Sequence, residues 1–247
     1  MNRNIDLVKF SGDGWTFKEE DSGIKVWFNS SGDIASLNLG DIASLNFFDI
    51  VPDLPSAVKQ ENITFFRNLY RHIVSTVNGG IVSVEIIDIK NIPSVEVILK
   101  IPQNPTGMSY IGSVTLPFKD FSFVMKYECP EHGMTGIRDT LIAVKIGDEL
   151  EHTPNGIPIG WMKDPYDSEY DSNARYNLSA QEKYDELFPE HPLTRVRNYL
   201  RNLSSNLMIH PDLINYPKFG EIKKPSTLPK ITFSSLLSSL RNLLSNS

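Results

Sequence analysis

Four strand-like segments in quick succession place the strongest limit on how this chain can fold. They are Val82–Lys90, Ser94–Ile101, Met108–Leu116 and Asp120–Glu128, and apolar side chains recur at alternate positions along them. Only three to six residues separate each segment from the next. Since a crossover between parallel strands needs about a dozen residues or more, these connections predict an antiparallel meander.

One amphipathic helix precedes the meander. Asn62–Asn78 carries apolar side chains at three-to-four spacing, and Gly79-Gly80 then provides a C-terminal stop. The order of helix and strands predicts an α+β fold in which an antiparallel meander sheet packs against this one long helix. The apolar positions of the helix are Ile63, Phe66, Tyr70, Ile73, Val74 and Val77.

An octapeptide occurs almost twice nearer the N-terminus, after a pair of strands expected within Trp15–Phe28. Gly32–Leu39 reads GDIASLNL and Gly40–Phe47 reads GDIASLNF. Apolar residues alternate within each copy, and an insertion of even length keeps every later side chain of a strand on its original face. We interpret the repeat as a duplication tolerated by a surface hairpin that closes at Gly40-Asp41, where an active site is not expected.

The segment Thr135–Ile146 fits either a strand or a helix. Its β-branched residues favour a strand, whereas apolar residues recur with helical spacing at Ile137, Leu141 and Val144. We favour a helix.

The C-terminal part of the chain predicts loops and short helices. Asp148–Asn177 is rich in Pro, Gly, Asp and Asn, which is typical of ordered loop. Ser179 and Glu182 have the spacing of a capping box that starts a short helix, and Pro192 suits the first turn of another. We expect three parts, namely an α+β domain at 1–147, a loop-and-helix appendage packed on it at 148–210, and a linker with an amphipathic helix at 211–247.

Arg195, Arg197 and Arg201 lie on the helix that Pro192 begins. Such a cluster can hold a phosphate or a partner's carboxylates. We favour internal ion pairs, because the preceding short helix offers several carboxylates. These are Glu182, Asp185, Glu186 and Glu190.

The charge balance narrows the kinds of partner. The 247 residues carry a net charge of −6. Binding to nucleic acid and docking on anionic lipid both use Lys and Arg, so we expect no nucleic acid and no electrostatically held membrane as partner. The chain begins with no apolar stretch of signal-peptide length, and its single cysteine excludes an internal disulfide, so a cytoplasmic protein is expected.

A catalytic interpretation rests on the short segment CPEHG, at Cys129–Gly133. There a thiol lies close in sequence to His132, and a thiolate nucleophile needs such a base within hydrogen-bond reach. A cysteine at a strand end is more often a small buried apolar group, so a Cys129/His132 hydrolase or transferase is the alternative function. No nucleotide-binding, serine-hydrolase or zinc-protease motif occurs, and we expect neither a metal site nor a cofactor.

Thr232–Leu244 predicts a last amphipathic helix, with an apolar stripe opposite serine and asparagine side chains. It could dock on the parent domain, in a partner's groove or, as an interfacial helix, on a membrane. Peripheral membrane binding through this helix is therefore a second alternative. The apolar residues of the stripe are Phe233, Leu236, Leu237, Leu240, Leu243 and Leu244.

Several segments resemble an uncharacterised bacterial protein family. They are VPDLPS, KIPQNPTGMSYIGSVTLPFKDFSFVMKYEC with GMTGIRDT, DPYDSEYD and YDELFPEHPLTRVRNYL, all within Trp15–Leu203. The order of helix and meander is also similar to the PsbP-like α/β sandwich, a fold of small binding, assembly and chaperone-like proteins. The resemblance implies this fold and no particular reaction.

These observations lead us to expect a non-catalytic protein-binding module of the adaptor, chaperone or immunity type, whose partner is another protein. Loops at strand ends on a rigid sheet commonly carry recognition residues. We therefore expect the contact surface in the loops at Gln103–Met108 and Phe118–Asp120 and around Arg138. The residues expected to touch the partner are Gln103, Asn104, Thr106, Met108, Phe118, Lys119, Asp120 and Arg138.

Overall fold

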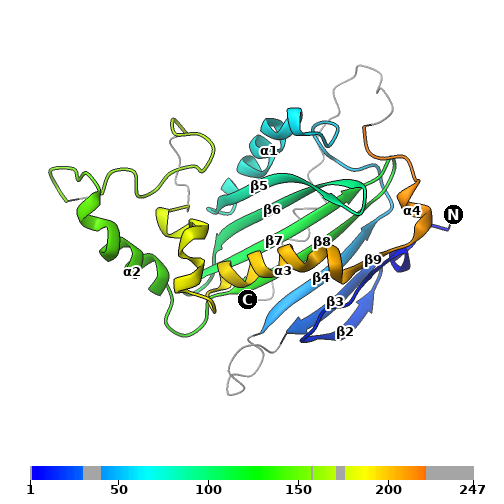
Figure 1. Cartoon of the computed structure of the whole chain (residues 1–247), viewed down its shortest axis with the longest axis horizontal. Coiled ribbons are helices and arrows are strands. Elements are labelled where there is room, and N and C mark those ends of the chain that lie inside the picture. The colour runs from blue at the N-terminus through cyan, green and yellow to red at the C-terminus, as the bar shows by residue number, and fades with distance from the viewer. Residues whose placement is uncertain (1, 30–39, 157, 171–175, 221–247) are drawn as a thin grey trace.

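A seven-stranded antiparallel sheet forms the centre of the computed structural model, which describes residues 2–29, 40–156, 158–170 and 176–220 (Figure 1). The strand order is β2-β3-β4-β8-β7-β6-β5, which confirms the α+β class with an antiparallel sheet. A separate two-stranded sheet joins β1 to β9. The strands are β1 Val8–Phe10, β2 Trp15–Asp21, β3 Ile24–Asn29, β4 Asp41–Phe48, β5 Gly80–Ile89, β6 Ile92–Pro102, β7 Met108–Pro117, β8 Ser122–Pro130 and β9 Leu207–Ile209. The α-helices are α1 Ile63–Ser75, α2 Ile137–Ile146, α3 Pro192–Asn206 and α4 Pro211–Ile214.

The predicted meander is present as β5 to β8, in which each strand pairs with the next along the chain. The N-terminal strands extend the sheet beyond it, because β4 pairs with β8. The second octapeptide copy supplies β4, and its Ala43 and Leu45 are fully buried, as the alternation predicts. The first copy, residues 32–39, lies outside the described residues.

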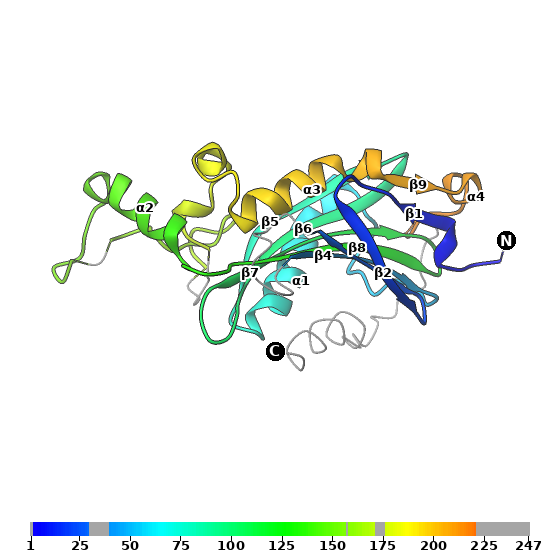
Figure 2. The same cartoon turned by 90° about the horizontal axis from the view of Figure 1, so that it is seen from below.

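Helices cover both faces of the sheet (Figure 2). The predicted helix, α1, lies against β5 on one face. The helix that Pro192 was expected to begin is present as α3, and it lies against β7 and β8 on the other face, where the sequence had predicted no covering helix. Strand alternation explains how both helices are accommodated, since Val95 and Val97 of β6 pack with the α1 side while Phe123 and Met125 of β8 pack with the α3 side.

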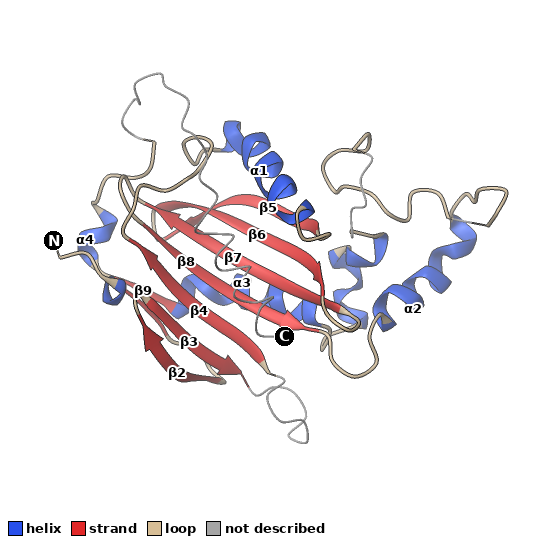
Figure 3. Cartoon of the chain, turned by 180° about the vertical axis from the view of Figure 1, so that it is seen from behind, coloured by secondary structure: helices blue, strands red, loops and turns tan. Residues whose placement is uncertain are grey.

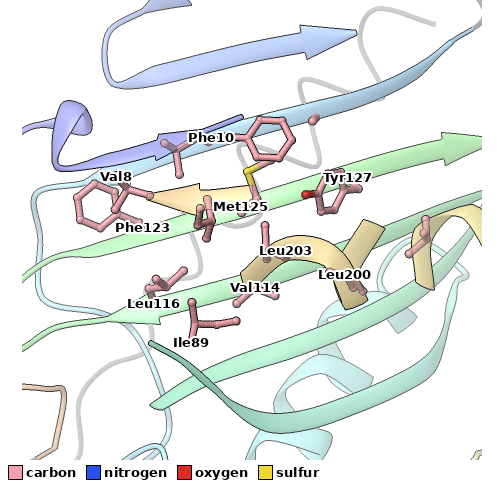
Figure 4. Packing of buried hydrophobic residues seen from close by; sticks show 14 of the residues in the cluster. Val8, Phe10, Ile89, Val114, Leu116, Phe123, Met125, Tyr127, Leu200 and Leu203 are labelled. Atoms are coloured by element: carbon pink, nitrogen blue, oxygen red, sulfur yellow. The ribbon is translucent and has the colours of Figure 1, made fainter. Parts of the chain in front are cut away.

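The approach of α3 to the sheet is close because Gly112 of β7 has no side chain. A Cβ atom at this position would lie 2.6 Å from Val196 Cγ1. Figure 4 shows Val114, Leu116 and Met125 of the sheet gathered under Leu200 and Leu203 of α3. This apolar layer fixes the position of α3 on the sheet. The first residues of the helix are thereby held at one end of the sheet.

The helix predicted within Thr135–Ile146 is present as α2, which lies beyond the ends of the strands and apart from the sheet (Figures 1 and 3). The short helix expected after Ser179 is replaced by 3₁₀ turns at Leu178–Ala180 and Glu182–Leu187. No capping box forms there, since Gln181 precedes the turn at Glu182–Leu187 without a side-chain cap, and the Ser179 hydroxyl donates to the Asp139 carboxylate.

The first ten residues of the expected linker, 211–220, pack on the domain. Leu213 of α4 is fully buried and Phe219 nearly so. The amphipathic helix predicted at 232–244 lies outside the described residues. Within the described ranges, no helix has the length and apolar character needed to cross a membrane.

Candidate functional site

The eight predicted contact residues lie at two opposite ends of the sheet. The turn between β6 and β7 holds Gln103–Met108, and the turn between β7 and β8, which holds Phe118–Asp120, lies at the other end of β7. The Arg138 region joins the first group, since Gln103 Nε2 donates to the Glu131 carbonyl at 2.7 Å. The two groups therefore do not form one surface.

Two of the eight residues are not accessible to a partner at all. Phe118 is fully buried and stacks on Phe121 with ring centroids 4.8 Å apart. Arg138 is 1% exposed. Asp120 is engaged within the chain, since its carboxylate accepts from the Tyr216 hydroxyl at 3.0 Å and pairs with Arg3 at 2.8 Å. These placements correct the expected surface at Phe118 and Arg138, and its accessible part is the first turn together with the exposed Lys119.

Arg138 is the centre of a buried polar network that joins α2 to the start of α3. The guanidinium donates hydrogen bonds to four acceptors, and Arg197 Nη1 shares one of them, Asp185 Oδ1, at 2.7 Å. A buried charge needs such partners, because desolvation otherwise strongly destabilises it. The four acceptors of Arg138 are Ser179 O at 2.8 Å, Gln181 O at 3.0 Å, Asp185 Oδ1 at 2.9 Å and Thr194 Oγ1 at 3.1 Å.

A second, partly buried ion pair joins α2 to the sheet. Lys100 Nζ of β6 lies 3.0 Å from Asp139 Oδ2, which also accepts from Asn177 Nδ2 at 2.9 Å. Burial acts to raise the pKa of the Asp139 carboxyl, but Lys100 and the hydrogen bonds from Ser179 and Asn177 outweigh it, so this pKa lies below its ordinary value. The inner side of α2 is thus fixed by two charged networks.

A cavity of about 550 Å³ opens at this end of the molecule, between the loop after β8 and the first residues of α2, α3 and β4. The second octapeptide copy contributes to this cavity, and the expectation that no active site lies at the repeat stays a prediction. Gly40 and Asp41 line one wall, and Met134, Ile137 and Phe188 line an apolar part of it. The complete lining is Gly40, Asp41, Pro130, Glu131, His132, Met134, Ile137, Arg138, Phe188, Pro189, Glu190, His191, Pro192 and Arg195.

The charged groups of the cavity are largely paired with one another. Arg195 Nε and Nη2 donate to the two oxygens of Asp41 at 2.8 and 2.9 Å, and the Tyr199 hydroxyl donates to Asp41 at 2.7 Å. The internal pairing favoured for the arginine cluster is therefore found for Arg195. It is found equally for Arg197, which pairs with Asp185, and for Arg201, which pairs with Glu182.

His191 is held by a hydrogen bond at Nδ1, whereas its buried Nε2 forms no hydrogen bond within the described residues. Nδ1 accepts from the Leu193 N–H at 3.2 Å and so caps α3, while Nε2 lies 3.4 Å from Glu131 Oε1. Burial lowers the pKa of His191, against the opposite effect of Glu131. With Nδ1 accepting from Leu193, a neutral imidazole carries its proton on Nε2 near Glu131, so in this form His191 caps α3 at the wall of the cavity.

Cys129 lies under the cavity and does not line it. It is fully buried among the residues that face α3, and burial raises the pKa of its thiol, with a further contribution from Asp41. His132, by contrast, is exposed. A thiol with a raised pKa carries little thiolate at neutral pH, so the geometry does not favour the Cys129/His132 alternative, which stays a prediction.

The described part of the chain contains no cluster of side chains suited to bind a metal ion. There, no three His, Cys, Asp or Glu side chains gather closely enough to hold a metal ion.

The outer face of α2 carries a row of exposed apolar side chains, which we call the α2 stripe. It consists of Met134, just before the helix, and of Ile137, Leu141 and Val144, which are 80%, 42%, 53% and 76% exposed, respectively. Met134 and Ile137 also line the cavity, so the stripe and the cavity form one continuous surface. The sequence signal was the helical spacing of Ile137, Leu141 and Val144, which indicated a helix but not which way this face points.

Comparisons with known proteins add little to this picture. No protein-family model matches the chain, and no curated protein matches its sequence. One similar solved structure is a crystal structure from Bacteroides thetaiotaomicron VPI-5482, with 8% identity and a TM-score of 0.33. The likeness covers 54% of this chain and 42% of that one, so the chain spans less than half the length of that protein. A likeness this distant establishes neither a family nor a function, and the PsbP-like resemblance stays a prediction.

Proposed function

We propose that the protein is a non-catalytic protein-binding module of the adaptor, chaperone or immunity type, acting in the cytoplasm, and that it binds another protein through the α2 stripe. The observation that carries the proposal is the exposure of four apolar side chains on one side of α2 and its entry. Single exposed apolar residues are ordinary, but a continuous patch is typical of an interaction surface.

The rigidity of α2 supports this function. Arg138 and Asp139 hold its inner side through the two charged networks, while Ile142 and Ile146 pack with Tyr184. A surface that is already ordered loses less conformational entropy on binding than a loop does. The stripe is thus presented in a fixed geometry.

The pairing within the cavity supports a non-catalytic role. Asp41 is satisfied by Arg195 and Tyr199, and His191 serves as a helix cap. A nucleophile and its base need to be free to exchange protons with a substrate, which these groups are not. The resemblance to PsbP-like binding and assembly proteins points in the same direction.

The proposal is tested with two matched variants. Leu141→Lys places a charge in the stripe, whereas Phe65→Lys places one at an exposed apolar position of α1, which is 56% exposed compared with 53% for Leu141. Proteins captured from native lysate by the wild-type chain would be purified and titrated against all three forms. We expect Leu141→Lys to weaken binding at least roughly tenfold and Phe65→Lys to leave it unchanged.

Thermal melting of both variants provides the control for folding. A stoichiometric partner that binds both variants equally well would show that the stripe is not the contact surface. The absence of any purified partner that distinguishes them would count against a protein-binding role.

A further inference from the structure

Three acidic side chains follow α2 directly and do not stabilise it. Asp148, Glu149 and Glu151 are exposed, and none of them forms an ion pair within the described residues. The C-terminal end of a helix carries the negative end of its dipole, so carboxylates there are unfavourable. Lys145 in the last turn offsets only one of the three charges. Asp148 and Glu149 belong to the three-residue 3₁₀ turn Gly147–Glu149, and the end of the α2 stripe carries a negative charge that no ion pair among the described residues neutralises.

The opposite end of the stripe opens into the cavity. Phe188 and Pro189 line it together with Met134 and Ile137, and its volume of about 550 Å³ exceeds that of any single side chain. Interfaces commonly place a large buried anchor side chain in such a pocket, and these anchors supply most of the binding free energy. An apolar anchor site thus lies at the start of α2 and an acidic group at its end, separated by about 15 Å of helix.

We infer, on the basis of the protein-binding function proposed above, that the partner presents an amphipathic helix with a basic end. Its apolar face would pack on the α2 stripe and insert one large apolar side chain beside Phe188. Its Lys or Arg side chains would lie against Asp148, Glu149 and Glu151. Helix-on-helix recognition uses apolar residues at the spacing of this stripe, and complementary charges at the edge select the partner and its orientation. An anionic membrane does not fit, because the same three carboxylates would repel it.

The experiment uses the full chain and two synthetic peptides of roughly four helical turns. Both carry the same leucine face with one phenylalanine, and they differ only in having lysines or glutamates at the end that would meet the acidic group. Binding is measured by fluorescence anisotropy at low and at physiological salt. We expect the lysine peptide to bind roughly tenfold more tightly, and this preference to shrink at higher salt.

Two sets of substitutions test whether the preference for the lysine peptide depends on the three acidic residues after α2. The triple variant Asp148→Asn, Glu149→Gln, Glu151→Gln should lose it, while Glu19→Gln, Glu20→Gln, Asp21→Asn, which removes three exposed acids from β2, should retain it. If Leu141→Lys abolishes binding of both peptides but they bind the wild-type chain equally well, the stripe binds helices and the basic-end inference is wrong. If the lysine peptide binds the Leu141→Lys variant undiminished, the stripe is not the binding surface, which overturns the proposed function as well.

Sedimentation of the unliganded protein tests whether a second copy of this chain covers the α2 stripe. A dimer that Leu141→Lys dissociates and Phe65→Lys preserves would show that a second copy of this chain covers the stripe. That result would overturn the inference of a basic partner helix. A monomer under the same conditions leaves the stripe open for the peptide and agrees with it.

Discussion

Substitution of Arg138 by methionine tests the buried network that holds α2. Methionine retains most of the length of the side chain but removes all four hydrogen bonds of the guanidinium. The carbonyls of Ser179 and Gln181 would then lose a donor. Asp185 would lose one of its two arginines but keep Arg197, at 2.7 Å.

The expected loss of stability follows from these contacts. Breaking a buried ion pair by removing one partner costs about 3–5 kcal/mol. Because Arg197 still pairs with Asp185, we expect the lower end of that range, about 3 kcal/mol for Arg138→Met. For a chain of this size each kcal/mol lowers the melting temperature by about 2–4 °C, so the midpoint should fall by about 6–12 °C.

Thermal and urea unfolding of three forms measures this loss. Arg201→Met is the matched control, because Arg201 and Glu182 form an exposed pair with side chains 49% and 69% exposed. Such a pair contributes at most about 1 kcal/mol. The reasoning would be refuted if Arg138→Met lost no more stability than Arg201→Met. Loss of partner binding with full stability would instead restore Arg138 as a contact residue.

Three further predictions address packing, the thiol and pH. Gly112→Ala should lower the free energy of unfolding by about 1–3 kcal/mol. The double variant with Val196→Ala should lose less than the sum of the two single losses, so strictly additive losses in unfolding experiments would contradict the close approach of α3. Cys129 should react with iodoacetamide far more slowly in the folded chain than in urea, and fast labelling of the folded chain would favour the cysteine-dependent alternative. Because burial lowers the pKa of His191, the unfolded state takes up the proton first, and stability should fall as pH drops below about 6.5. His191→Asn, which can still cap α3, should flatten this dependence between pH 7.5 and 5.5 as measured by melting temperature, and an unchanged slope would exclude His191 as its source.

The sheet shows how far local pattern predicts this fold. Alternation and short connections determine β5 to β8, because each pairing there involves neighbours in sequence. The pairing of β4 with β8 and the covering helix α3 were not predictable in the same way, since they join segments about 80 residues apart or more. Asp41 and Arg195, which form one wall of the cavity, are 154 residues apart. No spacing in the sequence brings such a pair together.

Two of the predicted contact residues, Arg138 and Phe118, are buried for a related reason. Arg138 was expected at the surface because loops at strand ends commonly carry recognition residues. Its burial depends on Ser179, Gln181 and Asp185, more than 40 residues away, whose acceptors surround it. Phe118 was expected in an accessible turn, but the turn folds back onto the aromatic side chains of β8. In both cases the type of turn or helix was predictable and the direction of the side chain was not.

The orientation of α2 is the strongest physical argument for its role. Leu141 and Val144 would each gain about 1.5–3 kcal/mol from full burial, but a helix turned by half a revolution would expose Arg138 and the buried Ile142 and Ile146. The observed helix does the opposite, and the Arg138 and Asp139 networks offset the free energy that its exposed stripe fails to gain. Charged networks of this kind hold a helix in one orientation more selectively than apolar packing does, since each donor requires a particular acceptor. An arrangement that holds an apolar face outward through such networks is explained if another protein buries that face.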